Sequence, residues 1–383
     1  MTKIWNKVKE ISSVSIADIS ASGIAAFFWF YIASILGPET YGQITYALSI
    51  AGLVSTISLL GASKTITVYT AKKIPLQPAF YIITLTAGLI SSIIIFLIFY
   101  NIGISLLIFG YIIFGLIIAE ILGKKLYKEY AKYVLTQRIL MVFLAIGLYY
   151  VFGEAGIIPG IACSFIPYIH GIIKGFRNNK INFKLVREKI GFITNSYLHT
   201  LSGVVSSSVD KLIIGPIFGF ALLGNYSLGL QFLTLLSLIP MAAGKYLIPN
   251  DATGDENKKL KKIIIIFSVI ITVVGFTIGP LVLTSFFPKF LEAEDVLRIV
   301  SISIIPSTII AVYHSKFLGR EKTRFVLISS CIWTIIQFIG ILVLGNIFGV
   351  NGIAISLVLA STSSCVFCFF VDKYFLQKND RNY

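Results

Sequence analysis

Apolar runs as long as a membrane span constrain this chain more than any other feature of its sequence. A transmembrane helix needs roughly 20 consecutive, mostly apolar residues, and twelve runs of about this length occur. They cover residues 12–36, 42–62, 78–99, 102–121, 134–152, 156–174, 191–217, 222–245, 262–284, 297–316, 324–346 and 350–371. The runs are apolar on every side, as a lipid-facing or buried helix is, and lack the alternation of barrel strands.

The polar residues are too few to enclose a water-soluble core. Charged residues make up 13% of the chain and hydrophobic residues 56%, whereas a soluble domain carries about 25% charged residues. The mean hydropathy is +0.89. We therefore predict an all-α membrane protein with about twelve transmembrane helices.

The positive charges alternate between successive loops. The formal net charge is +15, and most lysines and arginines lie at the two ends and in every second loop. The richest loops carry Lys124, Lys125, Lys128 and Lys132, or Lys174, Arg177, Lys180, Lys184, Arg187 and Lys189. By the positive-inside rule both termini are cytoplasmic, which fits a multi-pass protein of the cell (cytoplasmic) membrane. The same pattern argues against a nucleic-acid partner and predicts contact with membrane lipids.

Two short motifs recur at similar offsets along the chain. Residues 37–42 (GPETYG) match residues 219–224 (GFALLG), and residues 152–157 (FGEAGI) match residues 348–353 (FGVNGI). Such repeats indicate two related halves. We predict a six-helix lobe at 1–175, a cytoplasmic linker at 176–190 and a second six-helix lobe at 191–383, related by an axis along the membrane normal.

Polar residues inside the predicted spans are the candidates for function, because a charge at the centre of a span costs at least about 2.5–3.5 kcal/mol. One helical face of the span at 191–217 carries a polar stripe, and the first span carries a similar one. The candidate cavity-lining residues are Asp18, Ser22, Trp29, His199, Ser202, Ser206, Asp210 and Lys211. The alternative is that these side chains join neighbouring helices by hydrogen bonds.

Charges near the ends of spans have simpler explanations. Lys64 and Lys245 end the second span of each half and are suited to an anionic phosphate group at the cytoplasmic mouth, although the positive-inside rule also explains them. Glu120 and Arg138 are expected to reach for the membrane interface. Lys211 lies about 100° around the helix from Asp210, so we expect it to pair with another helix or to reach outward.

No catalytic or metal-binding motif occurs. GxSxG, HExxH, P-loop and GxGxxG patterns are absent from the sequence, and Cys365 and Cys368 lie in an apolar run without a histidine partner. We expect no enzymatic activity, no metal and no cofactor, with Na⁺ or H⁺ coupling through a buried aspartate as an open possibility.

Several segments resemble the polysaccharide-biosynthesis flippases, the Wzx-like branch of the multidrug/oligosaccharidyl-lipid/polysaccharide (MOP) exporter superfamily. They are residues 36–42 (LGPETYG), 209–215 (VDKLIIG), 224–227 (GNYS), 348–354 (FGVNGIA) and the stretch 296–324. The resemblance implies a MATE-like fold of two lobes in a V shape, alternating access, and flipping of a lipid-linked oligosaccharide from the cytoplasmic to the outer leaflet.

Three other functions remain open at this point. A cation-coupled drug or metabolite antiporter of the same fold would have a compact cleft and a buried carboxylate. A non-transporting scaffold that partners glycan-assembly proteins would have no cavity around Asp18 and Asp210. A membrane-embedded enzyme would need paired carboxylates around a pocket.

Overall fold

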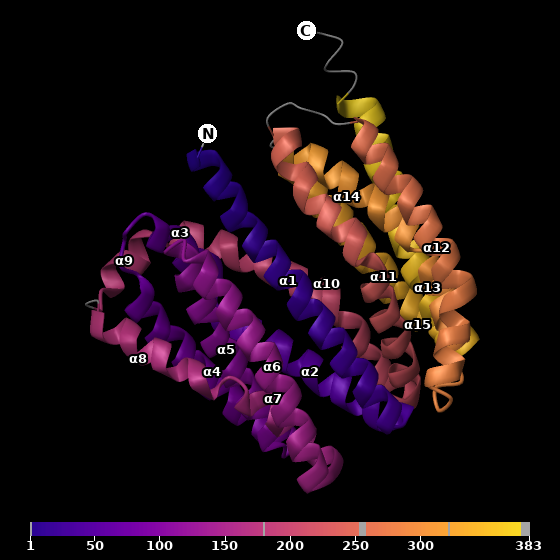
Figure 1. The fold of residues 1–383 in the computed structure, drawn as a ribbon, viewed down its shortest axis with the longest axis horizontal. Helices are drawn as coiled ribbons and strands as arrows, with labels where there is room; N and C mark the ends of the chain where they lie inside the picture. The colour runs from indigo at the N-terminus through magenta and orange to yellow at the C-terminus, as the bar shows by residue number, and fades with distance from the viewer. Residues whose placement is uncertain (1, 179–180, 253–257, 321, 377–383) are drawn as a thin grey trace. The chain divides into compact units, whose positions relative to one another are not determined.

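A computed structural model describes residues 2–178, 181–252, 258–320 and 322–376, and individual side chains are left undescribed at 1–13, 177–180, 199, 206–207, 239–258, 321 and 375–383. The described chain is helical, without strands (Figure 1). The first half contains α1 (Thr2–Ile35), α2 (Pro38–Leu59), α3 (Ala62–Ala71), α4 (Gln77–Phe99), α5 (Ile102–Gly123), α6 (Tyr127–Phe152), η1 (Gly153–Gly156), α7 (Ile157–Cys163), η2 (Ile166–Tyr168), α8 (Ile169–Asn178) and α9 (Phe183–Glu188). The second contains α10 (Ile190–Phe218), α11 (Phe220–Ala252), α12 (Lys258–Phe286), α13 (Ala293–Ser301), α14 (Ile304–Gly319), α15 (Thr323–Val371) and η3 (Asp372–Leu376).

Eight of the described helical segments are long and apolar enough to cross a membrane, or up to ten if each of two bent pairs is one span. The bent pairs are Ile190–Val205 with Ser208–Phe218 and Ala293–Ser301 with Ile304–Gly319. Two of the eight segments, Tyr127–Phe176 and Thr323–Tyr374, contain 50 and 52 residues, which is more than twice the length of a span. The chain is a multi-pass membrane protein, while the count of twelve and the side of the termini stay predictions.

Both long segments turn back on themselves at a glycine with a left-handed backbone. Gly153 has φ 65° and Gly349 has φ 59°, a conformation that glycine adopts without steric cost. The arms after each turn are antiparallel: a Cβ added to Gly156 would lie 2.2 Å from the carbonyl oxygen of Leu148, and the corresponding distance from Gly352 to Leu344 is 1.9 Å. The repeated FGxxGI motif thus marks two equivalent helical hairpins.

The other repeated motif marks a symmetric crossing of α2 and α11. A Cβ on Gly42 would lie 1.9 Å from the carbonyl oxygen of Phe220, and a Cβ on Gly224 would lie 1.9 Å from that of Pro38. Thr45 and Ser227, 182 residues apart, share a hydrogen bond of 3.3 Å between their hydroxyls. Each repeat therefore places its own glycine against the backbone of the other, as expected of two related halves.

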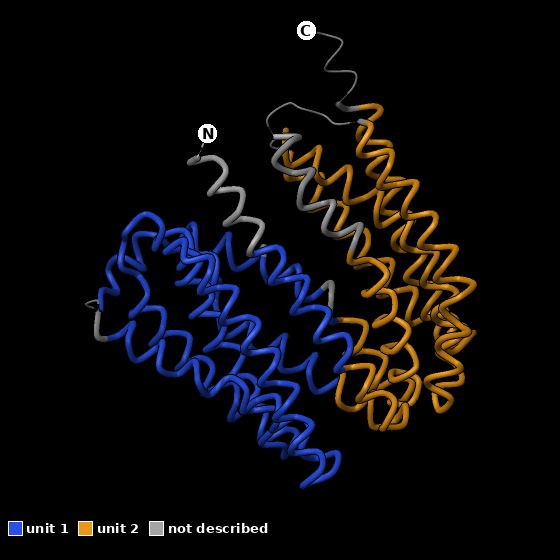
Figure 2. The backbone as a smooth tube through the Cα atoms, in the orientation of Figure 1, with its two compact units in different colours: residues 1–28, 46–208 blue, residues 29–45, 209–383 orange. Residues whose placement is uncertain are grey.

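Packing divides the chain into two compact units, one of residues 1–28 and 46–208 and the other of residues 29–45 and 209–383 (Figure 2). The chain passes from one unit to the other inside α1, α2 and α10. The lobe boundaries proposed from the sequence follow chain order, and they stay a prediction, as does the V-shaped arrangement.

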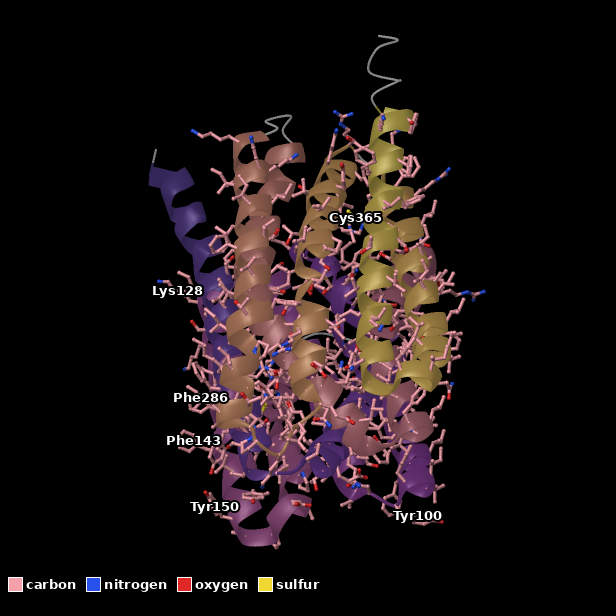
Figure 3. All side chains as sticks on the ribbon, turned by 90° about the vertical axis from the view of Figure 1, so that its right-hand side faces the viewer. Tyr100, Lys128, Phe143, Tyr150, Phe286 and Cys365 are labelled. Atoms are coloured by element: carbon pink, nitrogen blue, oxygen red, sulfur yellow. The ribbon has the colours of Figure 1, made fainter. Side chains whose placement is uncertain are left out.

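Each unit is built around a helix that the others cover. In the first unit α5 contacts α3, α4, α6, α7 and α8, and its residues Leu107, Ile108 and Ile112 are fully buried. In the second unit α11 packs against α12, α13, α14 and α15. Aromatic and aliphatic side chains project from the outer helices, among them Tyr100, Phe143, Tyr150 and Phe286 (Figure 3). Such exposed apolar surface suits a lipid environment.

Candidate functional site

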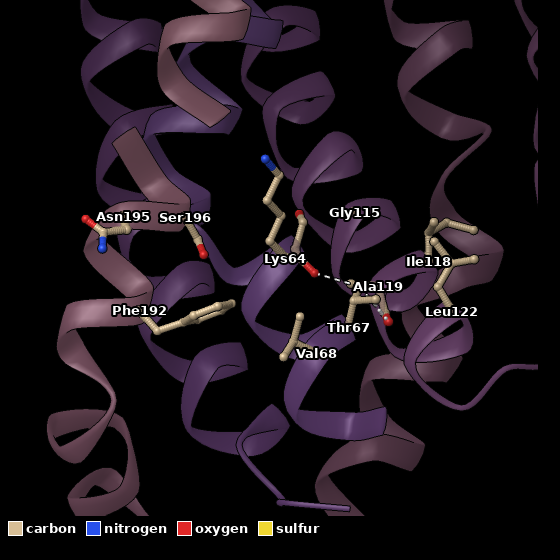
Figure 4. Close-up of a pocket in the computed structure, with 11 residues that line it drawn as sticks. Lys64, Thr67, Val68, Gly115, Ile118, Ala119, Leu122, Phe192, Asn195 and Ser196 are labelled. Carbon is tan, nitrogen blue, oxygen red and sulfur yellow. Dashed lines mark hydrogen bonds between the residues drawn. The ribbon is translucent and has the colours of Figure 1, made fainter. Parts of the chain in front are cut away.

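A pocket lies within the first unit, between α3, α5 and α10 (Figure 4). Its volume is about 650 Å³, within the range of about 300–1,000 Å³ typical of small-molecule sites. It is lined by Ser63, Lys64, Thr67, Val68, Gly115, Ile118, Ala119, Leu122, Phe192, Asn195 and Ser196. Most of its surface is apolar, so it suits a hydrocarbon group better than a sugar.

The pocket exists because the second apolar run ends in a sharp break. Leu60 and Gly61 have φ angles of 47° and 76°, so α2 stops and α3 starts in a new direction. A Cβ on Gly61 would lie 2.8 Å from the backbone nitrogen of Tyr197, which brings α3 against α10. On the other side the Thr67 hydroxyl donates a hydrogen bond of 3.1 Å to the carbonyl oxygen of Ala119 on α5.

Lys64 is the one charged residue among the eleven described residues that line the pocket. It is exposed, and it comes from α3 together with Val68, while Phe192, Asn195 and Ser196 come from α10 (Figure 4). Partial burial lowers the pKa of the Lys64 ammonium from its ordinary value. The sequence placed Lys64 at a cavity mouth, and the structure places it in a pocket lining.

Asp18 is half-buried in the first unit and accepts a hydrogen bond from a distant helix. The hydroxyl of Tyr130 on α6 donates to its Oδ1 over 2.7 Å. Ser22 is exposed, and its hydroxyl donates to the Asp18 carbonyl oxygen over 2.7 Å. Trp29, further along α1, belongs to the second unit and packs edge-on against Tyr41 at 6.2 Å between ring centroids. None of these three lines the pocket.

Asp210 is buried in the second unit within a connected polar cluster. Its Oδ2 accepts a hydrogen bond of 3.3 Å from the Tyr226 hydroxyl, which in turn accepts one of 3.5 Å from the Gln337 amide. The Gln337 Oε1 atom is buried without a hydrogen-bond partner among the described residues. We name Asp210, Lys211, Tyr226 and Gln337 the α10–α11–α15 polar cluster. The Gln337 Oε1 atom can accept a further hydrogen bond or coordinate a cation.

Lys211 differs from the expectation drawn from helical geometry. Its Nζ atom lies 3.8 Å from the Asp210 Oδ1 atom, and its backbone N–H donates to the same oxygen over 2.8 Å. The prediction treated the two side chains as diverging by 100°, but a flexible four-carbon stem can turn back toward its neighbour. The Asp210 carboxylate is thus charge-balanced within its own helix.

Glu120 is also placed differently from the expectation. It is 7% exposed, accepts a hydrogen bond from the Tyr81 hydroxyl and forms an ion pair with Lys124. A carboxylate near a span end can be held inside when a phenol from α4 and a lysine one turn along satisfy both oxygens. The expectation that the Glu120 side chain extends to the membrane interface is therefore wrong.

The remaining sequence candidates divide into two groups. Ser202 is exposed on the part of α10 that belongs to the first unit. The side chains of His199, Ser206 and Lys245 lie outside the described ones. Sequence reasoning missed Tyr130, Tyr226 and Gln337, although Tyr226 stands in the GNYS segment directly after the repeated glycine motif.

No family model matches this chain, and no curated protein matches it. Solved structures do. An inward closed structure of the lipid II flippase MurJ superposes with a TM-score of 0.75 at 15% identity, covering 94% of this chain and 87% of that one. An inward-facing multidrug resistance MATE family transporter of the MOP superfamily gives a TM-score of 0.70 at 14% identity, covering 95% and 96%. The chain has the fold that these two proteins share.

A third structure with this fold is a MOP superfamily transporter from Pyrococcus furiosus, described as having a binding pocket of reverse polarity. It gives a TM-score of 0.62 at 14% identity and covers 95% of each chain. The MATE-like fold expected from the sequence is therefore confirmed. These three solved structures are described as a flippase and two transporters.

Proposed function

We propose that this protein is a flippase that moves a lipid-linked oligosaccharide from the cytoplasmic to the outer leaflet of the cell membrane by alternating access. The observation that carries the proposal is the likeness to the lipid II flippase MurJ over 94% of the chain. The resemblance of residues 36–42, 209–215 and 348–354 to Wzx-like flippases supports the same class of cargo.

The distribution of charge supports an anionic, amphipathic cargo. A sugar-phosphate head cannot cross hydrocarbon unaided, because burying its polar groups without partners costs several kcal/mol for each. The excess of lysine and arginine at the predicted cytoplasmic loops attracts phosphate. Asp18, Ser22, Ser202, Asp210 and the undescribed side chains of His199, Ser206 and Lys245 stay our candidates for contact with the head group.

The α10–α11–α15 polar cluster supplies a candidate for energy coupling. Asp210 is buried, forms an ion pair with Lys211 and accepts a hydrogen bond from Tyr226. We propose that Na⁺ or H⁺ binds at Asp210 during the cycle, with the Gln337 Oε1 as a further ligand. Replacement of Gln337 by Met should weaken the dependence of transport on the Na⁺ or H⁺ gradient, whereas an unchanged gradient dependence contradicts the assignment.

The flippase proposal is tested in proteoliposomes. The purified protein is reconstituted with a fluorescent lipid-linked oligosaccharide, and a membrane-impermeant quencher reports the share of label in the outer leaflet. We expect about one half of the label, the share in the outer leaflet, to be quenched at once in both preparations, and the remainder to be quenched slowly in protein-free vesicles and rapidly with protein. Equal rates with and without protein, across the lipid-linked glycans of the native host, would overturn the proposal.

A drug or metabolite antiporter is the second candidate, favoured by the likeness to the MATE transporter over 95% of this chain. The same vesicles separate the two: an antiporter accumulates a soluble cationic dye against an opposing Na⁺ or H⁺ gradient and leaves the lipid label in place. A scaffold for glycan-assembly proteins would move neither probe.

A further inference from the structure

The pocket between α3, α5 and α10 combines an apolar interior with a single cation. Six of the eleven described lining residues are apolar: Val68, Gly115, Ile118, Ala119, Leu122 and Phe192. The Thr67 hydroxyl is already engaged by the carbonyl oxygens of Ser63 and Ala119. The interior therefore offers a polar ligand few partners and offers a hydrocarbon chain a continuous wall.

The charge at the pocket is of one sign. None of the eleven described lining residues is acidic, and Lys64 is the one basic residue. The nearby carboxylate of Glu120 on α5 is held by Tyr81 and Lys124. An anionic group in the pocket therefore meets one cation and no carboxylate among the described lining residues.

The pocket lies at the end of the first unit that carries the basic turns. Lys72 and Lys73 follow α3, and Lys124 and Lys125 follow α5, and these loops are cytoplasmic by the positive-inside prediction. Anionic phospholipids are concentrated in the cytoplasmic leaflet, where each basic residue near the surface adds to their attraction. Position, charge and apolarity thus point to the same class of ligand.

We propose that this pocket binds one acyl chain of an anionic membrane phospholipid, with the phosphate of the lipid at Lys64 and Asn195. The chain enters between α3 and α10, passes Phe192 and Val68 and reaches Gly115 on α5. The bound lipid is a resident of the first unit and does not depend on what the protein transports.

Gly115 gives a direct way to fill the pocket. A Cβ at this position would lie 3.4 Å from Leu59 Cδ1 and 3.7 Å from the Ser63 hydroxyl, which are ordinary contacts with side-chain ends. Gly115→Leu therefore adds four carbons to the pocket without displacing backbone. The matched control is Gly147→Leu on α6, an exposed helical glycine with nothing within 4 Å of its added Cβ.

The test uses detergent-purified protein and native mass spectrometry after incubation with phosphatidylglycerol, with phosphatidylcholine of the same chains, or with inorganic phosphate. We expect the wild type to retain one phosphatidylglycerol in preference to phosphatidylcholine. Gly115→Leu should reduce retention of both lipids by about tenfold, and Lys64→Gln should reduce the preference for phosphatidylglycerol by about fivefold. Gly147→Leu and Lys73→Gln should match the wild type.

A second measurement needs no variant. Phosphatidylglycerol with a photoreactive diazirine near the end of its chain is cross-linked in membranes, and we expect labelled peptides from residues 59–68 and 115–122. Labelling elsewhere, equal retention in wild type and Gly115→Leu, or no preference between the two lipids would each overturn the proposal. Displacement of the lipid by inorganic phosphate would also overturn it, because the site would then be one for free anions.

Discussion

The opening helices of the two halves each carry an aspartate, and the two aspartates are satisfied in different ways. Asp18 on α1 is half-buried and accepts from Tyr130, which lies 112 residues further along the chain. Asp210 on α10 is buried and accepts from Tyr226 on the next helix, 16 residues away, with Lys211 beside it. The same residue type thus sits in a long-range contact in one half and in a local cluster in the other.

The second helices of the two halves differ as well. α2 ends at Leu59 and the chain breaks before α3, whereas its counterpart α11 is continuous over 33 residues. The pocket between α3, α5 and α10 lies beside this break in the first unit. At the crossing of Gly42 and Gly224, by contrast, the halves remain equivalent. The two halves are thus alike at the α2–α11 crossing and differ in their second helices and in the contacts of their aspartates.

The largest effect is expected at the crossing. Gly42→Val and Gly224→Val each force a side chain onto a backbone carbonyl oxygen 1.9 Å from the added Cβ, and overpacking of this kind costs about 1–3 kcal/mol or more. If the halves are equivalent there, both variants should lower the thermal midpoint in detergent by similar amounts. A loss confined to one variant would show that the crossing is not symmetric. Gly52→Val on α2, with nothing within 4 Å, is the control.

The next largest effect is a difference in stability cost between the two aspartate substitutions. Asp210→Ala leaves a buried tyrosine hydroxyl and a lysine without their acceptor, which costs about 2–4 kcal/mol, whereas Asp18→Ala at a half-exposed site should cost about 1 kcal/mol. Thermal unfolding followed by tryptophan fluorescence measures both. An equal cost at the two positions would break the distinction drawn between them.

Substitutions of Tyr226 and Tyr130, the partners of the two aspartates, test the same difference. Tyr226→Phe removes a hydroxyl that donates to Asp210 and accepts from Gln337, and we expect a cost of about 1–3 kcal/mol because two buried groups lose a partner. Tyr130→Phe removes one hydrogen bond to a half-exposed carboxylate and should cost about 0.5–1.5 kcal/mol. A double variant Asp210→Asn with Tyr226→Phe should be less damaging than the sum of the two single changes.

The smallest effect is expected at the pocket between α3, α5 and α10. Because partial burial lowers the pKa of Lys64, its ammonium loses its proton as the pH rises through a value below the ordinary 10.5, and phosphatidylglycerol retention should fall there. Lys64→Arg should keep retention constant over the same alkaline range, since a guanidinium stays protonated. Native mass spectrometry across pH tests this, and a parallel decline in wild type and Lys64→Arg would contradict it.

Most helices could be predicted from the sequence, whereas the polar contacts between them could not. Apolar runs at 78–99 and 102–121 correspond closely to Gln77–Phe99 and Ile102–Gly123, since a run of that length in lipid has few alternatives to a helix. The run at 156–174 forms α7, η2 and the start of α8 instead of one helix, with Pro159 and Pro167 inside it. The run at 42–62 contains the break at Leu60, whose φ angle is 47° and which no feature of the apolar pattern marks.

Residue order alone determined that this chain lies in a membrane as helices and that it contains two related halves, because hydrophobic length and repeated glycine turns are local properties. Only the tertiary structure decided that Tyr130 meets Asp18, that Gln337 joins Asp210 through Tyr226, and that α3, α5 and α10 enclose a pocket with Lys64 in its lining. These contacts join segments far apart in the chain, and hydrogen-bond partners of that kind are set by helix packing and carry no periodic signal in the sequence.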